Sequence, residues 1–165
     1  MSRCLKLSVI CLAVTCVLLP ASLYAEDARE VKIIASAQDS PRAVSIGPVQ
    51  LNSYGGVVIR SAEELVAHSS RPDSAKDPTV QKAMQAELVK LLEVESIDWN
   101  KQMVLAVRGE PGTKADRVHF DSLKVEGKVL TVAWKVKQRP PHAGPGTPIA
   151  LILVERFDGE VKFAP

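Results

Sequence analysis

His68, His119 and His142 are the only histidines of this 165-residue chain, and histidine is the side chain whose charge changes near neutral pH. His119 and Asp121 stand two residues apart, so a regular strand would place them on one face, where the carboxylate can orient the imidazole as a general base. Phe120 is the apolar residue between them, which predicts that both side chains face solvent. A base with no identifiable nucleophile or metal gives little support to catalysis. We therefore predict no catalytic residue, and a small hydrolase using His119 or His142 is kept as an alternative.

Cysteine is missing from the chain beyond its first residues, and the common catalytic motifs do not occur. The three cysteines, Cys4, Cys11 and Cys16, all lie near the start. The rest of the chain has no thiol for a disulfide, a zinc site or a nucleophile. Neither the G-x-S-x-G sequence of serine hydrolases nor the H-E-x-x-H sequence of zinc proteases is present. The sequence predicts no metal and no cofactor.

Residues 139–148, with the sequence RPPHAGPGTP, form an unusual proline- and glycine-rich segment. Its glycines could expose neighbouring amides as a small anion-binding nest, and Arg139 and His142 add positive charge. A strand is predicted after this loop, where a phosphate-binding P-loop needs a helix, so a stiff crossover is the favoured interpretation. We expect any binding through loops at residues 108–116 and 139–148, with these residues: Arg139, His142, Gly144, Gly146, Arg108 and Gly109.

Residues 1–25 have the order of a secretory signal peptide. Arg3 and Lys6 give the N-terminal region a positive charge, and an apolar run occupies residues 7–19. Small residues follow up to Ala25, and the next two residues are acidic. The apolar run is too short to span a bilayer comfortably, which disfavours an uncleaved anchor. No cysteine follows the small residue that lipid attachment requires. We predict cleavage after Ala25, a secreted or periplasmic location, and no stable membrane insertion after cleavage.

The charge balance argues against nucleic acid as a partner. The whole chain has 21 lysines and arginines and 19 acidic residues, but residues 1–25 hold two of the basic residues and no acid. The remainder is electrically neutral, so it has no basic field that would gather phosphates. Hydrophobic residues make up 46% and charged residues 24%, which is typical of one globular domain of this length.

Two helices are predicted in the first half of the folded region. Ser61 and Glu64 have the spacing of a capping box, in which each side chain satisfies a free amide of the first turn, and this predicts a short helix. Asp77 followed by Pro78 predicts the start of a second helix, since proline at the first helical position loses no hydrogen bond. Apolar residues recur there at helical spacing to about Glu95.

After residue 100 the apolar period changes from that of a helix to that of strands. Five strands are predicted, over residues 103–107, 117–125, 130–136, 149–154 and 161–163. The second has a slip between Phe120 and Leu123 that predicts a bulge, and the fourth is apolar on both faces, as in the centre of a sheet. Asp158 and Gly159 predict a hairpin turn into the last strand.

Strands that follow helices and are joined mostly by short turns predict an α+β fold, with an antiparallel or mixed β-sheet and two helices packed on one face. We expect this single domain to cover residues 56–165. Residues 26–55 precede it as a polar lead-in, in which Val31, Ile33 and Ile34 indicate one possible edge strand.

The folded region resembles a known family in the order of its elements and in one short sequence motif. SAEEL at residues 61–65 is followed by a helix, by IDWNKQMVLAVRGEPGT at residues 97–113, and by hairpins, a Pro/Gly loop and a final apolar strand. Over about residues 56–165 this resembles the PrcB C-terminal-like domain family of bacterial secreted proteins. The chain departs from it at residues 112–116, where the family often has a glycine-rich T-G-G-Y stretch. The resemblance implies a non-enzymatic domain that associates with or stabilises an exported protein partner, such as a protease complex.

We therefore expect an exported, non-catalytic accessory or protein-binding domain of the bacterial cell envelope, stabilising a partner such as a protease. Exported domains without cysteine are more typical of bacteria than of small eukaryotic secreted proteins. Two alternatives stay open: the hydrolase described above, and a small-ligand carrier with a pocket between the sheet and the helix at residues 80–92. An aromatic content of 4% provides little stacking surface for such a ligand.

Overall fold

Two strands with nearly uninterrupted apolar sequences form the centre of the fold. They are β4 (Gln102–Arg108) and β7 (Ile149–Glu155), which pair antiparallel along their whole length. β2 (Ile33–Ser36) and β3 (Gly55–Ile59) flank them, and the order β2-β7-β4-β3 is called the inner sheet below. β7 is a central strand, as its sequence predicts. The structure is a computed structural model, and it describes residues 29–38, 55–109, 115–138 and 149–165.

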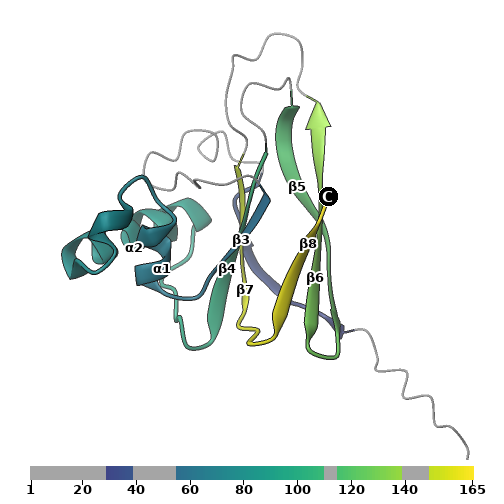
Figure 1. The fold of residues 1–165 in the computed structure, drawn as a ribbon, viewed down its shortest axis with the longest axis horizontal. Helices are drawn as coiled ribbons and strands as arrows, with labels where there is room; N and C mark the ends of the chain where they lie inside the picture. Colours follow the sequence, from purple (N-terminus) through teal and green to yellow (C-terminus); the bar gives the residue numbers. More distant parts are fainter. Residues whose placement is uncertain (1–28, 39–54, 110–114, 139–148) are drawn as a thin grey trace, which may run out of the picture.

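A second sheet, called the outer sheet, has the strand order β1-β5-β6-β8. The bounds of its strands are Arg29–Glu30 for β1, Ala115–Glu126 for β5, Val129–Gln138 for β6 and Glu160–Ala164 for β8. β5 and β6 form a hairpin, and Gly127 in its turn has a φ of 58°, a left-handed conformation that glycine adopts without steric cost. Figure 1 shows β5, β6 and β8 lying beside the inner sheet as a separate layer.

β5 contains a bulge where its apolar alternation slips. The register with β6 shifts between Phe120 and Ser122, which confirms the predicted bulge. At this point the Phe120 amide donates a hydrogen bond to Gln38 Oε1, with an N···O distance of 3.0 Å. Gln38 follows β2, so this bond ties one edge of the inner sheet to the outer sheet.

The last strand joins a different sheet from the one predicted. The predicted hairpin turn at Asp158 and Gly159 would pair β8 with β7. Instead, β8 pairs parallel with β6, and residues 156–159 carry the chain from the inner sheet to the outer sheet. The hairpin prediction is wrong because β7 already has β2 and β4 on its two sides, so it has no open edge for a further strand.

Two helices lie between β3 and β4 in the chain. They are α1 (Ala62–Ala67) and α2 (Pro78–Leu92), with a short 3-10 turn, η2 (Pro72–Ser74), between them. Each α-helix begins at the capping residue that the sequence predicts. Ser61 Oγ accepts a hydrogen bond from an amide of the first turn of α1 at 3.0 Å, and Asp77 Oδ1 accepts one from the first turn of α2 at 2.8 Å.

The details of the helix ends differ from the predicted ones. In a capping box the Glu64 carboxylate accepts from the amide of the capping residue, but here its Oε2 accepts from the Arg60 amide, one residue earlier, at 2.5 Å. α2 ends at Leu92 rather than near Glu95, because Glu93 takes a left-handed φ of 55°.

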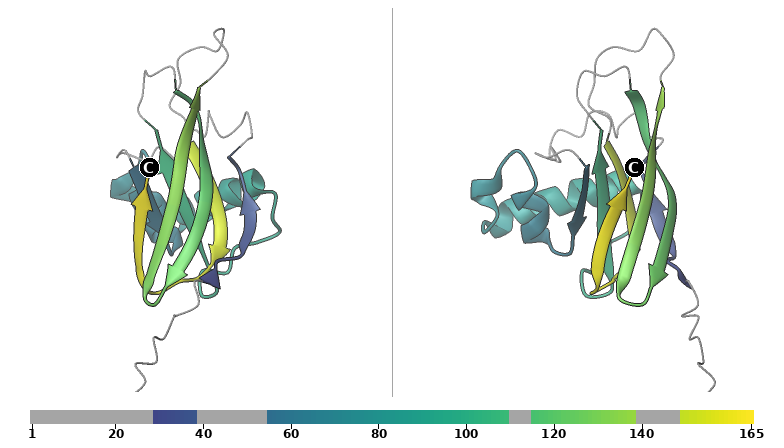
Figure 2. Two further views of the ribbon diagram at one scale, coloured as in Figure 1. Left: turned by 90° about the vertical axis from the view of Figure 1, so that its right-hand side faces the viewer. Right: turned by 45° about the vertical axis from the view of Figure 1, so that its right-hand side comes forward.

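The two central strands of the inner sheet, β4 and β7, are buried on both faces, which explains their apolar runs. One face shares a buried cluster with both helices, whose largest members include Ile59, Leu65, Leu88, Leu151 and Leu153. Alternate residues point the other way, into a cluster with the outer sheet that includes Met103, Leu105, Leu130, Val132 and Ile152. The views in Figures 1 and 2 show the resulting order of layers: helices, inner sheet, outer sheet. The α+β class is confirmed, with the strands divided between two sheets.

Candidate functional site

Five ends of the described strands meet at one end of the two sheets. Arg108 at the end of β4 pairs with Ile149 at the start of β7, and also with Gly55 at the start of β3. In the outer sheet, the start of β5 pairs with the end of β6. Both predicted binding loops therefore leave the described strands at this end, the top of Figure 1. We call it the upper rim, and it comprises Gly55, Arg108, Gly109, Trp134, Val136 and Ile149.

The structure places part of the predicted binding site at the upper rim. Arg108 is half-buried there, and Gly109 is buried. The other predicted binding residues lie outside the described residues: Arg139, His142, Gly144 and Gly146. The anion-binding nest therefore stays a prediction, whereas the position of Arg108 and Gly109 beside the start of β7 is a structural finding.

The upper rim also holds an apolar pair that sequence reasoning did not single out. Trp134 and Val136 alternate with lysines along β6, and that pattern predicts two buried side chains. Val136 is instead 43% exposed. Trp134 is half-buried, and its indole Nε1 is shielded from solvent without a hydrogen-bond partner in the described part of the chain. A buried indole N–H usually has an acceptor, so Trp134 is an exception among buried donors.

The histidine and aspartate that could form a general base lie on β5. Asp121 forms an ion pair with Lys135 of β6, and both side chains are 54% exposed. His119 is half-buried and lies opposite Lys135 in the register. The register shift falls between Phe120 and Ser122, so Asp121 is the extra residue of the bulge, and its side chain reaches Lys135, which lies opposite His119. Among the residues that the structure describes, no group of three or more His, Cys, Asp or Glu could hold a metal ion.

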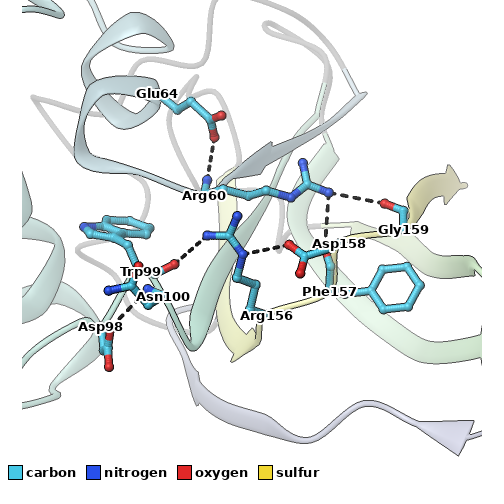
Figure 3. Close-up of polar contacts among 9 residues, drawn as sticks. All are labelled: Arg60, Glu64, Asp98, Trp99, Asn100, Arg156, Phe157, Asp158 and Gly159. Carbon is cyan, nitrogen blue, oxygen red and sulfur yellow. Dashed lines mark hydrogen bonds and ion pairs between the residues drawn. The ribbon is translucent and has the colours of Figure 1, made fainter.

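The opposite end of the two sheets is held together by two arginines (Figure 3). Arg60, between β3 and α1, donates from Nη2 to two backbone carbonyls of residues 157–159, each at 3.4 Å. Arg156 donates from Nη1 to the Trp99 carbonyl at 2.7 Å, and its Nε forms an ion pair with Asp158 at 2.7 Å. These contacts attach the crossover between the sheets to the segments before α1 and β4. Both guanidinium groups are engaged within the chain, so we assign this cluster a structural role.

Two hollows flank α2. One, of about 460 Å³, lies between α2 and the segment that includes Ser70 and Arg71. The other, of about 470 Å³, lies on the flank of α2 that faces Ala62 and Ser96. Neither of these two hollows is lined by a residue of the sheets. Buried side chains such as Leu88 fill the space between α2 and the inner sheet, where a ligand carrier would need its pocket.

Comparison of the chain with protein-family models, with curated proteins and with solved structures gives no match in any of the three. The resemblance to the PrcB C-terminal-like domain family therefore stays a prediction that rests on the sequence. In the described part of the chain, no helix has both the length and the apolar character needed to cross a membrane.

Proposed function

We propose that this protein is an exported, non-catalytic accessory domain of the bacterial cell envelope that binds another protein through its upper rim. Export to the periplasm or the medium is supported by the signal-peptide order of residues 1–25. Protein binding is supported by the geometry of Trp134 and Val136. The neutral charge of the chain beyond residue 25 also favours a protein partner over nucleic acid.

The observation that carries the proposal is the exposure of Val136 beside Trp134. Large apolar side chains in the described residues are mostly buried, and only Ile33, Ile34 and Val136 among them are exposed. A partner that covers Val136 would remove its side chain from water, a gain of about 1–2 kcal/mol. An aromatic anchor next to an aliphatic side chain is typical of the centre of a protein interface.

The family resemblance extends the proposal to the kind of partner. It implies a second exported protein, such as a component of a protease complex, that this domain stabilises. An accessory domain of this kind needs a stable fold and a contact surface, and it needs no catalytic group. The carboxylate of Asp121 is engaged in an ion pair with Lys135, which is consistent with that role.

Photo-cross-linking from the upper rim tests the proposal. Val136 is replaced by p-benzoylphenylalanine in the producing cell, and Lys82, which is exposed on α2, is replaced in a matched control. We expect one discrete protein adduct from position 136, with a yield at least about fivefold above that from position 82, because a specific contact is confined to one patch. Mass spectrometry identifies the adduct, and N-terminal sequencing shows whether the exported chain begins at Glu26.

Two results would contradict the proposed function. Equal adduct yields from positions 136 and 82, or no adduct from position 136, would show that the upper rim is not a binding surface. A protein that keeps residues 1–25 and stays in the cytoplasmic fraction would show that it is not exported.

A further inference from the structure

β6 is longer than its neighbour at the edge of the outer sheet. The pairing of β8 with β6 ends where Ala164 lies opposite Ala133, and β6 continues to Gln138. β8 is the last strand on that side, so no other described strand lies beside residues 134–138 there. We call this stretch of β6 the open edge.

The backbone of Val136 points towards the open edge. In an antiparallel pair, the amide and carbonyl of successive residues point alternately towards the partner strand and away from it. The Phe120 amide points away from β6, because it donates to Gln38 Oε1. Two residues before Phe120, the backbone amide and carbonyl of Val118 also point away from β6. Trp134 lies opposite Phe120 and Val136 lies opposite Val118, so the backbone groups of Trp134 and Val136 point away from β5. The amide and carbonyl of Val136 therefore face the place that a longer β8 would occupy.

The side chains around the open edge indicate what could bind there. Val136 is 43% exposed, and the buried indole Nε1 of Trp134 lacks an acceptor in the described part of the chain. Across the rim, a β-carbon added at Gly55 would have no heavy atom within 4 Å, so there is free space beside β3. Lys135 lies on the other face of β6 with its side chain 54% exposed. The edge thus combines backbone groups that have no described strand beside them, an apolar face, and a face on which Lys135 is paired with Asp121.

We propose that the open edge binds an extended segment of the protein partner, which adds a strand to β6 in line with β8. This proposal rests on the proposed function and specifies how the partner is held. Amide and carbonyl groups at strand spacing are complemented by another extended backbone, rather than by a helix or a small ligand. Val136 favours apolar residues at alternate positions of the segment, and an acidic residue between them would compete with Asp121 for Lys135.

Two other edges, at β2 and β5, are less suited to strand addition. β2 exposes Ile33 and Ile34, but its register with β7 shifts between Ile33 and Ala35. β5 has its bulge, and the amide of Phe120 is already bonded to Gln38. Bulges interrupt the regular spacing of backbone groups, and natural proteins use them to protect edges from pairing.

The test uses the exported protein purified from the producing cells and the synthetic peptide acetyl-Glu-Val-Glu-Val-Glu-Val-amide as the probe. We expect the NMR signals of the Val136 amide and of the Trp134 indole N–H to shift saturably as the peptide is added. A control peptide has proline in place of the middle valine, so it lacks one backbone amide. It should bind at least about tenfold more weakly, because a strand with proline loses a hydrogen bond of the ladder.

Two variants of Val136 separate its backbone from its side chain. Val136→Pro removes the amide that faces the open edge and should weaken peptide binding at least about tenfold, whereas Val136→Thr keeps the amide and should stay within about threefold. Hydrogen exchange of the unaltered protein provides a readout that does not depend on how the proline variant folds. The Val136 amide should exchange much faster than the Leu130 amide, which lies where β6 is paired with β8.

The possible outcomes distinguish this proposal from the proposed function. Strand addition is overturned by an absence of signal shifts, by equal binding of the proline peptide, or by a Val136 amide as protected as that of Leu130 in the free protein. In those cases, an adduct from position 136 would leave the protein-binding function standing, and the absence of that adduct would reject both. A free protein that sediments as a dimer, and becomes monomeric with Val136→Pro, would assign the edge to a second copy of the chain and overturn the proposal.

Discussion

The inner and outer sheets, as far as the structure describes them, differ in what covers their faces. In the inner sheet, residues 103–107 of β4 and 150–154 of β7 are all fully shielded from solvent. In β6 of the outer sheet, buried Leu130 and Val132 alternate with residues such as Thr131 that are exposed. Residues 103–107 and 150–154 therefore bury apolar side chains on both faces of the inner sheet, whereas β6 buries them on only one face of the outer sheet.

From this difference we expect the inner sheet to contribute most of the stability and the outer sheet to contribute the binding surface. A substitution in the buried residues of β4 or β7 disturbs the helix layer or the outer sheet, because these side chains are closely packed on both faces. The outer sheet keeps one face and the open edge of β6 in contact with solvent. Such a surface can change without loss of the fold, so we expect functional residues there and structural residues in the inner sheet.

The largest effect on stability is expected in the inner sheet. Leu153 lies on β7 opposite Val104, and both are fully buried in the cluster shared with the helices. We expect Leu153→Ala to lower the free energy of unfolding by about 2–5 kcal/mol, because the change removes apolar contacts and leaves a cavity. Urea unfolding followed by circular dichroism measures the difference.

Thr131→Ala on the exposed face of β6 is the matched control, and it should change the free energy of unfolding by no more than about 0.5 kcal/mol. If Leu153→Ala and Thr131→Ala lowered the free energy of unfolding by similar amounts, the proposed difference between the two sheets would be wrong. It would be sharpened if Leu153→Ala also lowered the unfolding temperature of the helices, because that residue packs in the cluster that both helices share.

A smaller effect is expected at Gly56, where one side of the inner sheet approaches the outer sheet. A β-carbon added at Gly56 would lie 1.9 Å from Cγ of Phe163 on β8, so the ring would have to move. We expect Gly56→Ala to destabilise the protein by about 1–3 kcal/mol through this overpacking. Phe163→Leu, made in the same chain, should recover part of the loss, and thermal unfolding of the four proteins measures the coupling.

Gly55→Ala provides the control for this cycle. The added β-carbon would have free space, but the φ of Gly55 is 93°, so the variant should lose about 1 kcal/mol from backbone strain alone. Phe163→Leu should not relieve that strain. If it relieves both glycine variants equally, the Phe163 ring is not what prevents a side chain at Gly56.

The parts of the fold that were predictable from the sequence depend on residues close together in the chain. Ser61 and Asp77 begin helices because a side-chain oxygen reaches amides two or three residues away. The apolar run of β7 indicates a strand buried on both faces whatever its neighbours are. The bulge in β5 was readable because an extra residue shifts the apolar alternation within the strand itself.

The parts that were not predictable depend on contacts between distant segments. Val161 and Phe163 alternate with charged residues, and that pattern fits an edge strand of either sheet, so it could not show that β8 pairs with β6. The exposure of Val136 also departs from the strict alternation of β6, which predicts a buried side chain at that position. Loop composition indicated Arg108 and Gly109 as binding residues; the structure gives their position at the upper rim, and their binding role stays a prediction.

The smallest effect is expected on the exposed face of the outer sheet, at the ion pair between Lys135 and Asp121. Both side chains are 54% exposed, so water screens their attraction, and ordering two flexible side chains costs entropy. In a double-mutant cycle with Lys135→Ala and Asp121→Ala, we expect a coupling energy below about 1 kcal/mol, which should vanish in about 1 M sodium chloride.

This cycle tests whether the exposed face of the outer sheet contributes little to stability, as the contrast between the sheets requires. Asp121 lies in the bulge of β5, so a pair that held the bulge in place would behave differently from an ordinary surface pair. A coupling energy above about 2 kcal/mol that persists at high salt would place a structural contact on the exposed face of the outer sheet. That face would then carry part of the stability we assign to the inner sheet. A weak, salt-sensitive coupling leaves Lys135 available to an acidic residue of an added strand.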